Sequence, residues 1–534
     1  MSDVDSLRAQ LRDRGYLTHG IERWFALDPW SSRTFWVELA LVALKAATLI
    51  ALFGAMLPTA VMLIRNRPLG VVETIALYGI YFAAAFLAGF ALVVVIALAL
   101  KIRPALPIDT PYALLAISLV AAALLTAPLG YWWFGFDTPP DRLELAVGGA
   151  FGILFFLVAS IVVSAALLSF SIYEVGRVPA IHQKPRGIPM TIAAVVLIGL
   201  LFVPAFSGRE QEEPAPMVVT RQTEHRLVLI GVDGLTYPIL RSRFDLARQF
   251  PTVNRGATVP GASTTERWAS LATGVPTSHH GVRAIEGLRL AGGADVLQRV
   301  SRADIALRTI APALALGQRE PLPPTVRRRD YVWEIVAERG LPGTSVNWWA
   351  TSSEKRGGLT AIGPEAIFAA AKNDPLRLDA IAIEQLVEML ERKNPRFAAV
   401  YLPSLDVMIN RLEIDPSARL TGSMHALDAL TRAVALVRER GYDVLLVGLP
   451  GDGQSGPAVI ASTLPLQGGI TTWDVAPTVL ATLGFPASRE MPGTPRMPEA
   501  QPRITSYGPR ESSEPARGMN REYYENLRSL GYIR

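Results

Sequence analysis

The chain has 534 residues, of which 50% are hydrophobic and only 19% charged, with a formal net charge of +5. Soluble globular proteins usually carry about 25% charged residues, so this composition favours a membrane protein. The absence of cysteine excludes a disulfide framework, a thiolate zinc site and a cysteine nucleophile. No Lys/Arg-rich run interleaved with aromatic residues indicates a nucleic-acid surface, so we expect no nucleic-acid partner.

A charged N-terminal segment, 1–33, is followed by five uncharged stretches that fill the chain up to residue 208. A helix that spans a bilayer needs about 20 apolar residues, and each stretch reaches or nearly reaches that length. The sequence therefore predicts a five-span helical transmembrane domain over 34–208, with the first span extended backwards through 35–43. The stretches are Ala46–Ile64, Thr74–Leu100, Thr110–Phe136, Leu145–Tyr173 and Gly187–Gly208.

The positive-inside rule orients these spans with the N-terminus in the cytoplasm. With that orientation ten Lys and Arg residues fall on the inner side and three on the outer side. An odd number of spans then places everything after residue 208 outside the membrane. The ten inner residues are Arg8, Arg12, Arg14, Arg23, Arg33, Lys101, Arg103, Arg177, Lys184 and Arg186, and the outer ones are Arg65, Arg67 and Arg142.

The five stretches contain no ionisable residue, whereas a transporter or a proton path normally needs such groups near the middle of the membrane. This absence argues for an anchor. The alternative is a bundle that also binds lipid or a partner protein.

A polar, proline-interrupted linker, 209–224, leads to a domain of different texture over 225–534. Its short apolar runs, 225–234, Ala398–Leu402 and Val444–Val447, are typical of buried parallel strands. Helical patterns such as Ala380–Leu390 and His425–Arg438 lie between them. This alternation predicts an α/β domain with a mostly parallel central sheet, whose chemistry gathers at the carboxyl ends of the strands.

Several motifs in this domain resemble the alkaline phosphatase superfamily, most closely its type I phosphodiesterase/nucleotide pyrophosphatase branch. They follow one another in the order of that branch across most of 225–534. The motifs are Leu227–Leu235, Pro260–Val275 with His280-Gly281, Arg329–Val346 with Asn347-Trp348-Trp349, Thr472–Phe485 and Asn526–Ile533.

The resemblance implies an alkaline phosphatase-like fold and, in active members, two divalent metals, usually zinc. The metals lower the pKa of a threonine or serine hydroxyl that attacks phosphorus, and they neutralise the phosphoryl oxygens. Asp233 matches a first metal ligand, Thr264 matches the nucleophile, and Asp406 matches the Asp of a D-x-x-x-H motif. Thr265, one residue further, is a weaker match to the nucleophile.

The remaining metal ligands of the family are missing. Asn410 stands where the His of D-x-x-x-H is expected, and 448–451 replaces the S-D-H-G turn without its Asp and His. A later His is expected near Gln454 or beyond, but no His follows His425. Asp452 could replace a lost carboxylate. Otherwise 451–453 is a tight turn.

The matching residues also have purely structural interpretations. Asp233 with Gly234 suits a turn at the end of a strand, and Thr264 could cap a helix that runs through Trp268. The histidines at 279–280 belong to a segment in which the family's His is structural. Trp348 and Trp349 could line a cleft or pack in the core.

The leading hypothesis is a pseudohydrolase on a membrane anchor, which acts in the cell envelope by binding lipid, glycan or protein and needs no cofactor. One alternative is an active phosphodiesterase or phosphotransferase, with a divalent metal (Zn, Mn or Mg) on Asp233, Asp406 and Asp452 and with Thr264 as nucleophile. Another is a structural subunit of an envelope complex. Spans followed by an outer domain of this superfamily are also similar in plan to lipoteichoic acid synthases and phosphoethanolamine transferases.

The composition, rich in Ala, Arg and Leu, indicates a bacterium of high genomic GC content. We therefore expect a multi-pass protein of the bacterial cytoplasmic membrane with a periplasmic or extracellular C-terminal domain. Its expected partners are membrane lipids and an envelope protein.

Overall fold

A computed structural model of the chain describes residues 35–66, 69–102, 111–136, 138–175, 195–200, 218, 220–261, 263–454, 456–498, 501–510 and 521–533, and the single positions 6, 10 and 13. The chain forms two compact units. The first comprises 1–210 together with 288–318, and the second comprises 211–287 and 319–534. The segment 288–318 lies inside the predicted outer domain in sequence, but in the structure it belongs to the unit that contains the apolar helices.

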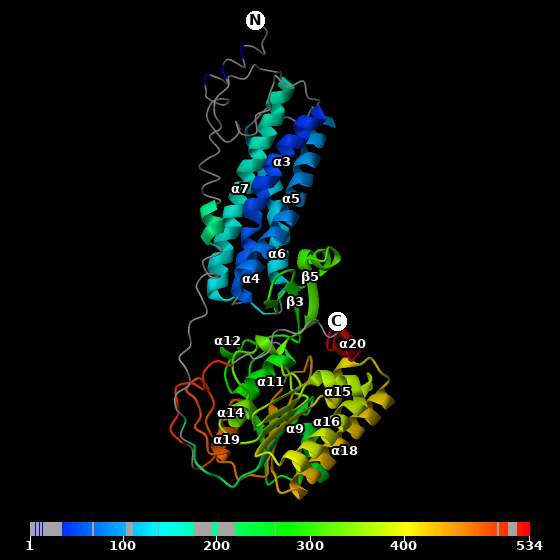
Figure 1. Cartoon of the computed structure of the whole chain (residues 1–534). Helices are drawn as coiled ribbons and strands as arrows, with labels where there is room; N and C mark the ends of the chain where they lie inside the picture. The colour runs from blue at the N-terminus through cyan, green and yellow to red at the C-terminus, as the bar shows by residue number, and fades with distance from the viewer. Residues whose placement is uncertain are drawn as a thin grey trace. The chain divides into compact units, whose positions relative to one another are not determined.

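Long apolar helices dominate the first unit (Figure 1). Four stretches of the described residues are long and apolar enough to cross a membrane: Leu39–Arg65, Val71–Ala99, Leu115–Phe134 and Arg142–Leu167. They correspond to the first four predicted spans. The fifth predicted span, 187–208, lies largely outside the described residues. Within it the structure describes only 195–200, which are helical. The helices are α3 (Phe35–Gly54), α4 (Met56–Arg65), α5 (Val71–Ile102), α6 (Pro111–Phe134) and α7 (Arg142–Val175).

The first span is broken into α3 and α4 at Ala55. Pro58 has no backbone N–H to donate to the preceding turn, and its ring crowds the carbonyl four residues earlier. Gly54 allows the close packing that this break requires, because a side chain there would come within 3.0 Å of the ring of Phe155 on α7. The break therefore lies where α7 approaches the first span.

The segment 288–318 is bound to the ends of these helices by polar contacts as well as apolar ones. Asn66 pairs with it like a strand: its Oδ1 accepts from the backbone N–H groups of Gln298 (2.9 Å) and Arg299 (2.8 Å), while its Nδ2 donates to the Arg299 carbonyl (2.9 Å). Glu73 accepts from the Asp295 N–H (2.9 Å). Leu290, Leu297 and Leu307 are buried in one cluster with Leu57, Val61, Leu77 and Trp132 of the helices.

Asp304 is a second polar anchor of this attachment. Its Oδ2 accepts from the Tyr81 hydroxyl of α5 and from the Trp132 indole N–H of α6, each at 2.6 Å. Its Oδ1 accepts from the backbone N–H of Leu307 (2.8 Å), at the start of the π-helix η1 (Ala306–Ile310). One buried carboxylate thus joins two helices to the segment.

The second unit is built on an eight-stranded sheet in the order β2-β11-β10-β1-β9-β6-β8-β7. Its five central strands, β10 to β8, are parallel, and the outer pairs β11–β10, β2–β11 and β7–β8 are antiparallel. The predicted α/β domain with a mostly parallel sheet is confirmed. The strands are β1 (Leu227–Asp233), β2 (Thr252–Gly256), β6 (Gly343–Val346), β7 (Glu354–Arg356), β8 (Leu359–Ile362), β9 (Phe397–Leu402), β10 (Asp443–Leu449) and β11 (Ala458–Ser462).

Helices connect these strands. The main ones are α9 (Tyr237–Ser242), α11 (Thr264–Thr273), α14 (Val332–Glu338), α15 (Pro364–Ala371), α16 (Pro375–Lys393), α18 (Pro416–Glu439), α19 (Val475–Thr482) and α20 (Arg521–Ser529). Shorter ones are α10 (Phe244–Ala247), α12 (Thr277–His280), α17 (Ser404–Asp406), the π-helix η3 (Val407–Arg411) and the 3-10 helices η2 (Pro324–Val326) and η4 (Thr472–Asp474). Strands β3 (Glu286–Leu290) and β5 (Gly317–Pro321) lead the chain into and out of the segment 288–318. With β4 (Val296–Leu297) they form a three-stranded sheet, while α13 (Ala311–Ala313) follows η1.

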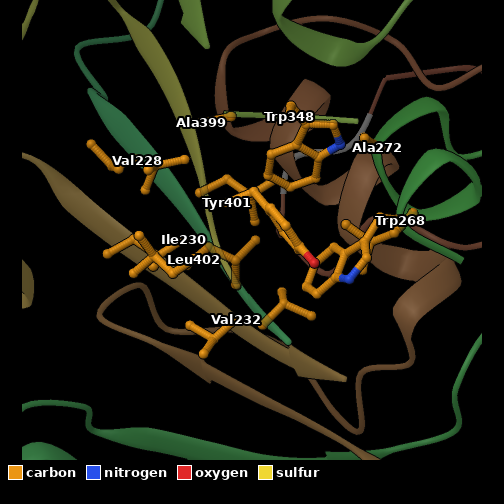
Figure 2. Packing of buried hydrophobic residues seen from close by; sticks show 14 of the residues in the cluster. Val228, Ile230, Val232, Trp268, Ala272, Trp348, Ala399, Tyr401 and Leu402 are labelled. Carbon is orange, nitrogen blue, oxygen red and sulfur yellow. The ribbon is translucent and has the colours of Figure 1, made fainter. Parts of the chain in front are cut away.

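An aromatic cluster packs on the central strands (Figure 2). Trp268, Trp348 and Tyr401 meet edge to face, with ring centroids 5.4–6.2 Å apart. Gly231 in β1 makes room for them, because a side chain there would lie 2.7 Å from the Trp268 ring. Trp348 and Trp349 are buried, which supports the core interpretation over the cleft interpretation.

We expect Asp304→Ala to loosen the segment 288–318. The change leaves the buried Tyr81 hydroxyl and Trp132 N–H without their acceptor, at a cost of about 1–3 kcal/mol for each donor. Trypsin should then cleave the detergent-solubilised full-length protein faster at Arg302 and Arg308. Tyr81→Phe, which removes only one donor, should have a smaller effect. An unchanged cleavage rate in Asp304→Ala would show that this carboxylate does not hold the segment.

Candidate functional site

The sequence-predicted site residues meet at one edge of the large sheet, where the central parallel strands end. Asp233 is the last residue of β1, and Asp406 follows β9 in α17. Gly234 makes the approach possible, because it has a φ of +81° and a side chain there would lie 2.9 Å from the Asp406 backbone. Both carboxylates are fully buried.

Each oxygen of Asp233 has a donor from the aromatic cluster. The Trp268 indole N–H donates to Oδ1 (3.3 Å) and the Tyr401 hydroxyl to Oδ2 (3.1 Å). Burial raises the pKa of Asp233 to about 7; the nearby charge of Asp406 adds to the rise, while Arg411 and Arg267 oppose it. The position is therefore an unfavourable one for a negative charge.

Asp406 is held by three different donors. Arg411 donates from Nε to Oδ2 at 2.5 Å, and Asn410 donates from Nδ2 to Oδ1 at 2.7 Å. The backbone N–H of Asp452 donates to the same Oδ1 at 2.8 Å. The turn after β10 approaches so closely that a side chain at Gly451 would come within 1.9 Å of Oδ1.

Thr264 is buried and lies at the first turn of α11. Its Oγ1 accepts a hydrogen bond from Nη2 of Arg411 at 3.1 Å. The helix is capped by Ser263, whose Oγ accepts from the Glu266 N–H at 3.1 Å, so the interpretation of Thr264 as the capping residue is wrong. Thr265 contacts Ser263, with the two hydroxyl oxygens 3.3 Å apart.

Arg411 is the residue that sequence reasoning missed, and it joins the site together. Besides Asp406 and Thr264, its Nη1 lies 3.6 Å from an Asp452 carboxylate oxygen. Its guanidinium stacks on the ring of Tyr532 at 4.1 Å from the centroid. Although burial disfavours its charge, Tyr532, Asp406 and Asp233 raise the pKa of Arg411 above its usual value.

Local backbone geometry brings Arg411 to this place. It ends the π-helix η3, in which the Leu412 N–H bonds to the Val407 carbonyl, a step of five residues. The wider turn brings Arg411 onto the carboxylate of Asp406, five positions earlier in the chain. Gly531 of the C-terminal motif packs closely against Arg411, because a side chain at 531 would lie 2.9 Å from the Arg411 carbonyl oxygen.

The positions where family ligands are missing have other partners. Leu449, at the expected Asp of the lost turn, pairs in register with Asp233 and is fully buried. Asn410, at the expected His, accepts at Oδ1 from the Gln454 amide at 2.8 Å. Asp452 lies in the tight turn 451–453, and its side chain is 48% exposed.

This arrangement does not fit a two-metal centre. Among the described residues no group of three or more His, Cys, Asp or Glu side chains could hold a metal ion. All four oxygens of Asp233 and Asp406 accept hydrogen bonds, one of them from a guanidinium. The guanidinium of Arg411 thus lies among the side chains that would have to bind a metal ion.

The histidine next to this region is structural, in agreement with its expected role. Buried His280 bonds through Nε2 to the Ser270 hydroxyl (2.8 Å), and its Nδ1 accepts from the Val282 N–H (3.1 Å). Burial and the nearby Arg327, Arg283 and Arg328 lower the pKa of His280 to about 3.

Comparison with known proteins identifies the domain. Residues 227–448 match the family model of type I phosphodiesterase/nucleotide pyrophosphatase. This match over 227–448 confirms the resemblance to that branch that is seen in the motifs. No curated protein matches the chain.

Several solved structures are similar to this chain. The chain spans little more than half the length of the first two described here. Human ectonucleotide pyrophosphatase/phosphodiesterase 5 is 12% identical over 42% of this chain and 56% of that one, with a TM-score of 0.29. Phosphonoacetate hydrolase from Sinorhizobium meliloti 1021 is 13% identical over 43% and 57%, with a TM-score of 0.30. The lipoteichoic acid synthase LtaP from Listeria monocytogenes is 9% identical over 52% and 78%, also at 0.30.

We expect Arg411→Met to destabilise the second unit strongly. Removing the guanidinium leaves the buried Asp406 carboxylate without its cation, which costs about 3–5 kcal/mol in comparable sites. Asp452→Asn is the matched control, because this half-exposed partner at 3.6 Å contributes at most about 1 kcal/mol. Thermal unfolding of the full-length protein in detergent, followed by tryptophan emission, measures both. Equal melting temperatures for the two variants would contradict the assigned role of Arg411.

Stability should also fall as the pH falls, because of His280. Its folded-state pKa of about 3 lies below the usual value near 6.5, so only the unfolded chain takes up a proton between these pH values. The group's contribution is complete above about pH 6.5 and is lost by about 1.4 kcal/mol per pH unit below it. The melting-temperature difference between wild type and His280→Asn should therefore shrink from pH 7 to pH 4. A constant difference would mean that His280 titrates normally.

Proposed function

We propose that the outer domain is a pseudohydrolase: it keeps the phosphodiesterase fold but has lost two-metal hydrolysis. The observation that carries this proposal is the position of Arg411, whose guanidinium binds Asp406 and the Thr264 hydroxyl together. In the family's chemistry a metal lowers the pKa of that hydroxyl and binds that carboxylate. Here a positive charge is supplied without Lewis acidity, since a guanidinium has no empty coordination position.

The replacements at the lost ligand positions support the same conclusion. Both replacements have partners of their own. Leu449 is packed in the core, and Asn410 forms hydrogen bonds with Asp406 and Gln454. In a site whose metal ligands are replaced by hydrogen-bonded residues, the polar side chains stabilise the fold. We infer that the domain now serves binding.

The membrane topology of the first unit would determine the compartment in which the domain binds its ligand. We propose five spans in a bacterial cytoplasmic membrane, an N-terminus in the cytoplasm and an outer domain in the periplasm or outside the cell. The four apolar helices support membrane anchoring, and the lysine and arginine asymmetry supports this orientation. The ligand classes that fit are a lipid headgroup, an envelope glycan or an envelope protein.

The second candidate is an active phosphodiesterase or phosphotransferase with Thr264 as nucleophile. One observation favours it: Thr264, Asp233 and Asp406 do lie at one edge of the sheet, where the chemistry of α/β proteins gathers. A metal would then have to displace Arg411 from Asp406.

Metal content and turnover distinguish the two candidates. We expect the purified full-length protein, grown with zinc and manganese, to contain far less than one metal per chain by mass spectrometry. It should not hydrolyse bis(p-nitrophenyl) phosphate with added Zn²⁺, Mn²⁺ or Mg²⁺. Near-stoichiometric metal that disappears in Asp233→Asn, with turnover lost in Thr264→Val and kept in Thr264→Ser, would overturn the proposal and establish the enzyme.

A further inference from the structure

The segment 301–316 carries a row of apolar side chains that nothing in the described structure covers. Ile305, Ile310 and Leu314 are 69%, 44% and 63% exposed, and Leu316 is 43% exposed. The first two lie five residues apart across the π-helix η1, whose wider turn places them on one side. On the opposite side Leu307 and Ala311 are fully buried. The segment thus has apolar side chains on both sides, of which one side is buried and the other is exposed.

The segment is fixed at a definite level along the spans. Asp304, directly before Ile305, accepts hydrogen bonds from Tyr81 on α5 and Trp132 on α6. The Ser301 hydroxyl bonds to the Trp132 carbonyl (2.5 Å), and the Arg302 N–H bonds to the Gly135 carbonyl (2.9 Å).

That level lies about one hydrocarbon thickness from the far ends of the helices, as expected for a membrane boundary. Tyr81 lies 21 residues from Ile102 at the far end of α5, and Trp132 lies 21 residues from Pro111 at the far end of α6. At 1.5 Å per residue both distances are about 31 Å, which is the thickness of the hydrocarbon core. Tyrosine and tryptophan also prefer this boundary, where their rings are apolar and their N–H and O–H groups remain polar.

We propose that the segment 301–316 is an interfacial membrane-binding element, with Ile305, Ile310, Leu314 and Leu316 inserted among the lipids of the outer leaflet. The occupant is lipid because the row begins beside two residues at the boundary and continues the exposed apolar surface of the spans. Phe134 and Tyr131, next to Trp132, are 81% and 76% exposed on that surface. Arg308 lies within the row, between Ile305 and Ile310, where a guanidinium suits lipid phosphates.

A fluorescence experiment on the full-length protein tests this proposal. Because the chain has no cysteine, Ile305→Cys and Leu314→Cys each introduce a single site for an environment-sensitive NBD label. The matched control is Leu420→Cys on α18 of the second unit, a leucine with nearly the same exposure, 66%. The labelled proteins are reconstituted in phosphatidylcholine nanodiscs that contain nitroxide-labelled lipid.

We expect the labels at 305 and 314 to emit at shorter wavelength than the label at 420, and to be quenched by the nitroxide lipid but not by aqueous iodide. Emission at the wavelength of the control, with iodide quenching at 305 and 314, would overturn the proposal. In that case the row would face water and be free for a protein partner. Exposed positions are chosen because their replacement removes no buried contact.

Discussion

The pairing of a buried carboxylate with a buried guanidinium is the interaction on which the candidate site of the second unit depends. Two aspartates end up fully buried at one edge of the sheet because the strands that carry them are parallel neighbours. Two such charges side by side are tolerated only if a cation or protonation compensates them. Arg411 supplies that cation and also occupies the Thr264 hydroxyl, so the electrostatic problem that metals solve in the family is solved within the chain.

Much of the architecture could be predicted because it depends on local pattern. Four helices long and apolar enough to cross a membrane follow from uninterrupted apolar length, and β1, β9 and β10 follow from short apolar runs between helical patterns. The meeting of Asp233 and Asp406 followed from the rule that parallel strands end at a common edge. The resemblance to the phosphodiesterase branch was visible in the order of the motifs, and the family model matches the same region.

The missed features depend on contacts between distant parts of the chain. Arg411 reaches Asp406 through a π-turn and is held by Tyr532, more than a hundred residues away, and neither is visible in a local window. The only signal was a cation directly beside the Asn that replaces the expected His. The attachment of 288–318 to the helices was likewise hidden, because no sequence pattern marks an asparagine whose side chain hydrogen bonds to a distant backbone.

The division of the chain into units has a practical consequence for protein production. A soluble fragment that starts at the linker would still contain 288–318, but without the helices that bury its Leu290, Leu297 and Leu307. Those leucines would face water without their apolar partners, and Asp304 would lose its two side-chain donors, so the fragment would expose a surface prone to aggregation. A tractable fragment would replace 288–318 by a short polar turn that joins Gly287 to Arg319.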